Sequence, residues 1–284
     1  MKKLLIYCLV AIAITACKKK DEEANISQKL KSVTTTNNSG FNQKVAFSYN
    51  KSGHLERADK YENGVLLSYF EYTYNAGLIT SAKSYIKSLG SNQYDQLANI
   101  KLTYNGNRLT ELAVFPIKPG SPVEPTKYLF EYGSGEIPVK FSLALNDGSM
   151  IDCSYGDIAS SPFSLGQSSA YFEIWNRWRR PGDEPISGPN RQVTYGLEFD
   201  DKNNPFYKLP WIDVESMGGD IQYVFSASGY FGKNNPIKTS LSFDGSPLYS
   251  YTSTYTYLST GYPEKSTATH SLNNTKLETI YEYW

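Results

Sequence analysis

The chain has 284 residues, with 28 Lys and Arg against 28 Asp and Glu, so no basic excess exists to attract nucleic acid. A mean hydropathy of -0.46 is typical of a soluble globular chain rather than a helical membrane protein or a disordered tail. Two His and three Cys leave few ways to build a metal cluster or a histidine-dependent nucleophile. We therefore predict no catalytic residue, no metal ion and no cofactor.

The start of the chain has the pattern of an export signal. Two lysines precede a short apolar stretch, residues 4–14, which is too short to cross a bilayer as a mature helix. The stretch ends in Ile14-Thr15-Ala16-Cys17, which resembles the bacterial lipobox, whose cysteine is lipidated and becomes the mature N-terminus. We predict a signal peptide over residues 1–16 and a lipid on Cys17 that anchors the protein without a transmembrane helix.

A charged linker follows this cysteine. Lys20-Asp21-Glu22 resembles the signal that carries Bacteroidota lipoproteins to the outer face of the outer membrane. We therefore expect residues 17–30 to be a lipidated tether and residues 31–284 to form a single β-meander domain. The expected location is the outer membrane, lipid-anchored and exposed on the cell surface.

One short phrase recurs along most of the remaining chain: an apolar residue, a polar one, a Tyr or Phe, then Asn, Asp or Gly. Its copies are Phe47-Ser48-Tyr49-Asn50, Tyr72-Thr73-Tyr74-Asn75, Leu102-Thr103-Tyr104-Asn105, Phe130-Glu131-Tyr132-Gly133, Leu197-Glu198-Phe199-Asp200 and Tyr255-Thr256-Tyr257. Alternate residues of a strand share a face, so the apolar positions pack together while the polar residue points to water. The Asn, Asp and Gly that follow favour tight turns, so each copy predicts one hairpin.

The predicted fold is all-β: an antiparallel meander of repeated hairpins, rolled or closed into a soluble barrel-like sheet. Strands of about nine or ten residues would also fit a barrel embedded in the membrane. Residues 54–62 argue against it, because Glu56 and Lys60 lie on one face and Arg57 on the other, so neither face could contact lipid. The C-terminal strand agrees, since Trp284 shares its face with Glu282.

The repeat resembles the tyrosine-aspartate (RHS-like) hairpin repeats of large secreted β-shells. In addition, Tyr255-Thr256-Tyr257 followed by Gly261-Tyr262-Pro263 is similar to a phrase frequent in an uncharacterised family of Bacteroidota outer-membrane lipoproteins, described as having a porin-like fold. The resemblance covers most of residues 44–284 and implies a fold and a location, with no catalytic residue. No clean copy occurs between Tyr155 and Val193, so we expect an irregular insert near residues 156–193.

A segment rich in Trp and Arg within residues 171–180 is the candidate binding site. In an extended strand either of its faces sets a flat ring beside a guanidinium, a surface that can stack on a sugar ring, an aromatic group or an anionic headgroup. The predicted ligand- or partner-binding residues are Trp175, Arg177, Trp178, Arg179, Tyr207 and Trp211. A strand whose Trp residues fill the core, with the Arg stems covering it, is the alternative that the sequence leaves open.

These observations favour a non-enzymatic, surface-anchored lipoprotein that binds a ligand or partner, with a glycan or another envelope component as the expected class. Its partners would be the membrane, through Cys17, and a glycan or envelope protein, but no nucleic acid. One alternative is a structural or assembly subunit of an outer-membrane complex whose open sheet edges pair with another chain. Another is a hydrolase that uses a carboxylate pair such as Asp183-Glu184 or Asp200-Asp201, although no nucleophile or phosphate-binding motif supports it.

Overall fold

The computed structural model describes residues 28–117, 124–134, 138–144, 150–154, 169–179, 192–207, 209, 233–243 and 246–284. The strands are β1 (Leu30–Asn37), β2 (Asn42–Tyr49), β3 (Leu55–Glu62), β4 (Val65–Asn75), β5 (Leu78–Lys87), β6 (Tyr94–Asn105), β7 (Arg108–Pro116), β8 (Thr126–Tyr132), β9 (Pro138–Ala144), β10 (Met150–Ser154), β11 (Ser169–Arg179), β12 (Gln192–Phe199), β13 (Pro236–Phe243), β14 (Ser246–Tyr257), β15 (Pro263–His270) and β16 (Lys276–Tyr283). The described residues contain no helix with the length and apolar character to cross a bilayer.

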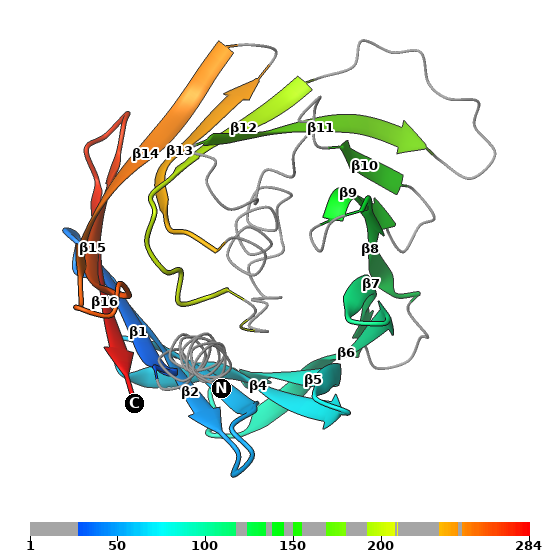
Figure 1. The fold of residues 1–284 in the computed structure, drawn as a ribbon. Coiled ribbons are helices and arrows are strands. Elements are labelled where there is room, and N and C mark those ends of the chain that lie inside the picture. The colour runs from blue at the N-terminus through cyan, green and yellow to red at the C-terminus, as the bar shows by residue number, and fades with distance from the viewer. Residues whose placement is uncertain are drawn as a thin grey trace, which may run out of the picture.

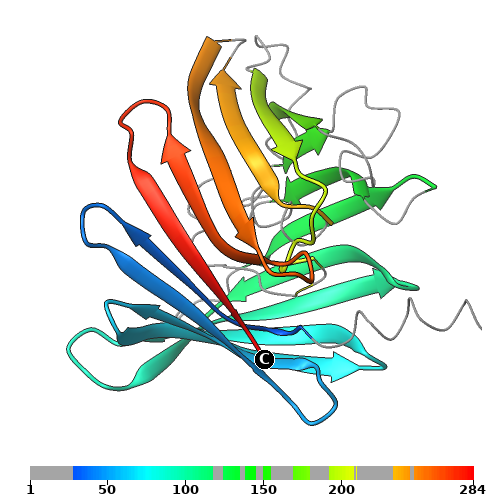
Figure 2. The ribbon, with the colours of Figure 1, turned by 60° about the vertical axis from the view of Figure 1, so that its left-hand side comes forward.

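The strands form one antiparallel meander that closes on itself. Each strand pairs with its neighbours in the chain, and β1 pairs with β16, so the described strands make a closed barrel (Figure 1). Figure 2 shows the first and last strands, blue and red, side by side. The all-β antiparallel meander predicted from the repeat is confirmed, and its sheet is closed rather than merely rolled.

Each copy of the repeat ends a strand at the same end of the barrel, which we call the motif rim. The opposite end, which carries the turns after β1, β3, β5, β7, β13 and β15, is the far rim. Every copy also has a β-bulge directly before its last aromatic residue. The register shifts fall at Ser48/Tyr49, Thr73/Tyr74, Thr103/Tyr104, Glu131/Tyr132, Glu198/Phe199 and Thr256/Tyr257. Because a bulge bends its strand and increases the local twist, this repetition favours closure of the sheet.

Tyrosine hydroxyl groups tie adjacent strands together at the motif rim. Each lies near the end of an even-numbered strand and donates to a backbone carbonyl at the start of the preceding strand. The pairs are Tyr49 with Leu30, Tyr132 with Leu109, Tyr255 with Pro236 and Tyr283 with Pro263, at 2.8 to 3.0 Å. These bonds satisfy carbonyl groups at the strand ends, where the backbone hydrogen bonds between strands stop.

The inward face of the barrel carries large buried apolar side chains. Phe47, Phe70 and Leu112 are at most 2% exposed. The segment that follows β12 turns into the barrel (Figure 1), where Phe206 and Leu209 pack against the core cluster around Phe47. These contacts show which face of the sheet points inward. The apolar positions of the repeat lie on this face, so they pack together as the sequence alternation predicted.

The outward face carries ion pairs, most of them between neighbouring strands. They join Lys44 to Glu282, Arg57 to Asp59 and Glu71, Lys127 to Glu111, Lys238 to Glu198 and Lys265 to Glu278. Strand β16 shows the alternation plainly, with Glu278 and Glu282 exposed and Tyr281 half-buried. A barrel in contact with lipid needs an apolar outer belt, so this charged wall is the opposite of that arrangement.

Some of the sequence predictions fall wholly or partly on residues that the structure does not describe. The signal peptide, Cys17 and most of the tether lie outside the described residues, as does Trp211. Strand β11 and the start of β12 lie within residues 156–193, which we expected to be irregular. The described parts of this stretch are regular strand, because β-prone residues can continue a meander without the turn residues that mark the repeat.

Candidate functional site

Two of the predicted binding residues, Trp175 and Tyr207, lie toward opposite rims of the part of the barrel that the structure describes. Trp175 lies on β11 and pairs in register with Gln192, at the far-rim end of β12. Tyr207 follows the other end of β12, where its N–H donates to the carbonyl of Asn204 at 3.2 Å and Lys233 lies 5.8 Å from its ring centroid. Strand β11 also contains Arg177, Trp178 and Arg179, but the structure describes only the backbone of this strand. A single site containing all six residues stays a prediction.

A ring beside a guanidinium, the combination sought on β11, occurs on the outer wall of β3 to β6. The guanidinium carbon of Arg57 lies 3.6 Å from the centroid of the Tyr69 ring. Tyr69 stacks on Tyr85 with centroids 4.5 Å apart and planes at 16°, and the Tyr94 ring lies 5.4 Å from Tyr69. We call this group the outer tyrosine platform; it comprises Arg57, Asp59, Tyr69, Glu71, Tyr85 and Tyr94.

Strand register brings the platform together. Arg57 pairs with Glu71, Asp59 pairs with Tyr69, and Tyr69 pairs with Tyr85. Directly opposed residues of antiparallel strands share a face, with their Cβ atoms about 5 Å apart, which allows rings to stack. The platform therefore forms because Asp59, Tyr69 and Tyr85 point outward from three adjacent strands and lie in one row across them.

Carboxylates hold the platform cation in place. Arg57 Nε lies 2.6 Å from Asp59 Oδ1, and its Nη1 lies 3.6 Å from Glu71 Oε1. Burial, followed by the negative charge of Glu71, raises the pKa of Tyr85 above its ordinary value, so the phenol stays protonated and can donate a hydrogen bond. At the far-rim end, the Tyr94 hydroxyl donates to the Leu66 carbonyl at 3.0 Å.

This arrangement combines an open ring face with polar groups at its edge. Arg57 and Tyr85 each make a ring contact with Tyr69, whereas the described residues bring no second ring and no cation to Tyr85. Carboxylate oxygens have more than one lone pair, so Asp59 and Glu71 can accept from a ligand while paired with Arg57. The platform can thus stack on a flat apolar surface and bind hydroxyl groups beside it.

Reasoning from the sequence missed the platform because Tyr69, Tyr85 and Tyr94 lie outside the repeat. A signal was nonetheless present: Tyr69 shares its alternation face with Glu71, so it points away from the core side occupied by Phe70. A tyrosine in phase with charged residues indicates an outward ring. The neighbouring strands that complete the stack could not be assigned without the register.

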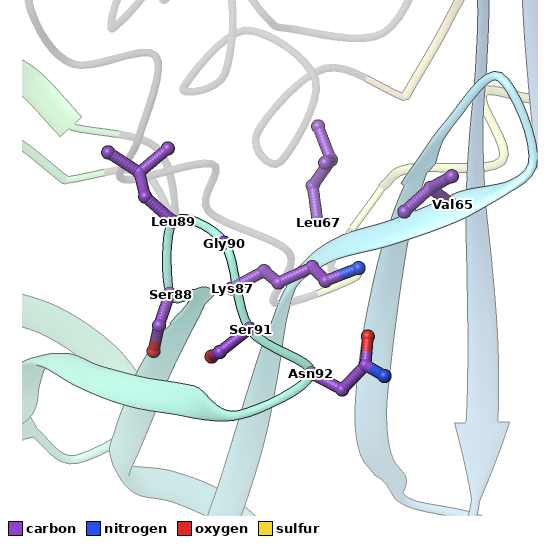
Figure 3. Close-up of a pocket in the computed structure, with 8 residues that line it drawn as sticks. All are labelled: Val65, Leu67, Lys87, Ser88, Leu89, Gly90, Ser91 and Asn92. Atoms are coloured by element: carbon purple, nitrogen blue, oxygen red, sulfur yellow. The ribbon is translucent and has the colours of Figure 1, made fainter.

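The far rim carries a second concave feature. A cavity of about 590 Å³ lies between the start of β4 and the β5–β6 loop, and Figure 3 shows the residues around it. They are Val65, Leu67, Lys87, Ser88, Leu89, Gly90, Ser91 and Asn92. Exposed large apolar side chains gather at or near the same rim. These are Val65, Ile86, Leu89, Leu97, Phe115, Ile117, Leu248 and Leu272.

Asp200 and His54, two described residues that could in principle take part in catalysis, make contacts that stabilise the fold. Asp200 accepts hydrogen bonds from the backbone N–H groups of Lys202 and Asn235, both at 3.0 Å, and from the Tyr257 hydroxyl. Its carboxylate thus organises the turn after β12, while Asp183-Glu184 lies outside the described residues. His54 is half-buried and stacks on Tyr74 with ring centroids 4.7 Å apart.

Comparisons with known proteins give similarity at low identity. No family model matches the chain, and no curated protein matches it. Among solved structures, the chain is similar to a porin-like protein from Bacteroides uniformis, at 10% identity and a TM-score of 0.43, over 91% of this chain and 98% of that one. It is also similar to a porin-like protein from Bacteroides vulgatus, at 11% identity and a TM-score of 0.49, over 90% and 99% of the two chains.

Proposed function

We propose that this protein is a non-enzymatic lipoprotein, anchored to the outer membrane through Cys17 and displayed at the cell surface, and that it binds a glycan on the outer tyrosine platform. The anchor and the location are supported by the lipobox and by the Lys-Asp-Glu phrase of the tether. The observation that carries the binding role is the stack of Arg57, Tyr69 and Tyr85 on the outer wall.

A glycan fits the chemistry of this stack. Each sugar ring has an apolar C–H face and a rim of hydroxyl groups. The face can stack on Tyr85, and the hydroxyl groups can bind the platform's carboxylates and the Arg57 guanidinium. The platform side chains are already held by ring stacking and ion pairs, so ligand binding would cost little side-chain entropy.

The position of the platform agrees with a tethered protein. The tether joins β1 at Leu30 on the motif rim, whereas Tyr85 and Tyr94 lie near the far-rim ends of their strands. Anchoring at one rim would therefore leave the platform clear of the bilayer. The assembly alternative relied on open sheet edges, and the described strands offer none because β1 pairs with β16.

A glycan array tests the proposal. The full-length protein is compared with Tyr85→Ala, with Arg57→Ala and with the control Tyr262→Ala, which removes a half-buried tyrosine of the β14–β15 turn, away from the platform. We expect Tyr85→Ala and Arg57→Ala to weaken glycan binding by about tenfold, or roughly 1.4 kcal/mol, and Tyr262→Ala to leave it unchanged. Circular dichroism of each variant establishes that it is folded.

Two outcomes would contradict this assignment. Loss of binding in a Trp178→Ala/Arg179→Ala double variant, with Tyr85→Ala unaffected, would move the site to β11. Absence of any glycan bound by the folded wild-type protein would remove the glycan role. The anchor is tested separately: we expect Cys17→Ser to abolish incorporation of radiolabelled palmitate and to release the protein from the membrane fraction.

A further inference from the structure

We propose that the far-rim cavity binds the alkyl chain of a single-chain carboxylate amphiphile, a fatty acid, whose head group is held by Lys87. The cavity shares no residue with the outer tyrosine platform, although Lys87 pairs in register with Tyr94 of the platform. Its volume of about 590 Å³ lies within the roughly 300 to 1,000 Å³ typical of small-molecule sites.

The apolar part of the cavity matches an alkyl chain. Val65, Leu67 and Leu89 supply aliphatic surface without an aromatic ring. Figure 3 shows Leu67 and Leu89 pointing in the same direction from the two sides of the cavity. Leu89 is fully exposed and Val65 is 45% exposed, so an alkyl chain lying between them would remove apolar surface from water.

The polar part of the cavity selects an anion. Lys87 is the only charged residue of the lining given above, and it makes no ion pair with any residue that the structure describes. Figure 3 shows its side chain crossing from the loop toward the start of β4. The nearby carboxylate of Asp95 accepts from Ser88 Oγ at 2.5 Å, so it already has a partner. A ligand carboxylate would provide the missing counter-charge.

Backbone hydrogen bonds define the loop that forms one wall of the cavity. The Ser88 N–H donates to the Gln93 carbonyl at 2.9 Å, and the Ser91 N–H donates to the Ser88 carbonyl at 3.2 Å. Gly90 has a φ of 74°, which glycine adopts without strain, so Leu89 is held at the tip of a defined turn. These contacts give this wall of the cavity a defined backbone geometry.

Calorimetric titration of the full chain carrying Cys17→Ser, which needs no detergent, tests this site. We expect decanoate to bind more tightly than octanoate, with about a fourfold gain for each added methylene until the cavity is full. Lys87→Gln should weaken decanoate binding by about fivefold and leave decanol binding unchanged. Decyltrimethylammonium, which has the opposite charge, should bind more weakly than decanoate.

Exposed leucines on two hairpins provide a matched pair. Leu89→Ser should weaken binding of both decanoate and decanol, whereas Leu272→Ser, on the β15–β16 hairpin of the same rim, should change neither. Both side chains are exposed, so neither substitution is expected to disturb folding. Equal effects at Leu89 and Leu272 would mean unspecific association with the rim and would overturn the site. Decanoate binding that is insensitive to Lys87→Gln, or absent below the concentration at which decanoate aggregates, would also overturn it.

Discussion

The hydroxyl of Tyr283 donates a hydrogen bond to the carbonyl of Pro263 at 2.8 Å, joining the end of β16 to the start of β15. Pro263 is fully buried, so water cannot replace the donor. We expect Tyr283→Phe to lower the free energy of unfolding by about 1 to 3 kcal/mol, because a buried acceptor loses its partner. Urea unfolding followed by circular dichroism measures the change.

Tyr251 provides the matched control for this substitution. It lies on the same inward face, contacts the rings of Tyr249 and His270, and has no hydrogen bond from its hydroxyl to any described residue. Tyr251→Phe should therefore change the free energy of unfolding by less than about 0.5 kcal/mol. Equal losses in the two variants would show that the rim hydrogen bond contributes nothing specific.

The raised pKa values of several tyrosines lead us to expect that the protein unfolds at high pH. Burial raises the pKa of Tyr49 to about 12, and it raises the pKa values of Tyr255 and Tyr283 further. An unfolded tyrosine has a pKa of about 10, so the stability that these residues give is complete below about pH 10 and is lost as the pH rises through the folded values. We expect the last part of the tyrosinate absorbance, which comes from these residues, to appear together with loss of the β-sheet signal. Full ionisation of all tyrosines in a folded barrel would contradict this expectation.

We expect Glu282 to cause a smaller loss of stability at acid pH. A hydrogen bond from the Ser32 hydroxyl, helped by the charge of Lys44, lowers the pKa of its carboxyl. Its contribution is therefore present above the ordinary pKa of about 4.3 and is lost as the pH falls through the lower folded value. Glu282→Gln should reduce the difference in melting temperature between neutral and acid solution. The effect should be modest because half of this side chain is exposed.

Glu278, an exposed residue on the same face of β16, controls for general loss of charge. It pairs with Lys265 at 3.0 Å but receives no serine hydrogen bond within the described residues. Glu278→Gln should change the acid dependence less than Glu282→Gln does. If both variants behaved alike, the hydrogen bond from Ser32 would have no part in the effect.

Ala76 occupies a turn position that disfavours alanine. Its φ is 49° and that of Gly77 is 81°, the same values found for Asn63 and Gly64 in the β3–β4 turn. Left-handed backbone costs most L-residues about 1 kcal/mol or more, whereas Asn tolerates it. Ala76→Asn should therefore raise the free energy of unfolding by about 1 kcal/mol, as measured by urea unfolding. The reciprocal change, Asn63→Ala, should lower it by a similar amount.

Local chemistry explains which parts of the fold were predictable from the sequence. The strand ends at Tyr49 and Tyr74 follow from residues that are adjacent in the chain, and both were predicted. The charges on both alternation faces of residues 54–62, which argued against contact with lipid, could be read from the sequence for the same reason. Bulges were not predictable, because they depend on how one strand aligns with the next.

The candidate site required information that neighbouring residues do not contain. Arg57, Tyr69 and Tyr85 belong to three different strands, and only their register brings them into one stack. Sequence reasoning selected β11, where Trp and Arg are adjacent in the chain, and that site stays a prediction. Residues that meet only across neighbouring strands give no comparable signal in the sequence.

Joining β1 to β16 also constrains how the chain can fold. The hydrogen bond between Ser32 and Glu282 spans 250 positions in the sequence, whereas every other strand pair can form between consecutive strands. Contacts of such long separation are formed late, because the chain must be ordered before they offset the entropy of closing the loop. Among the described strands, β1 must therefore keep one edge unpaired until β16 is complete, so the seam between them is the part of this sheet that stays open longest during synthesis.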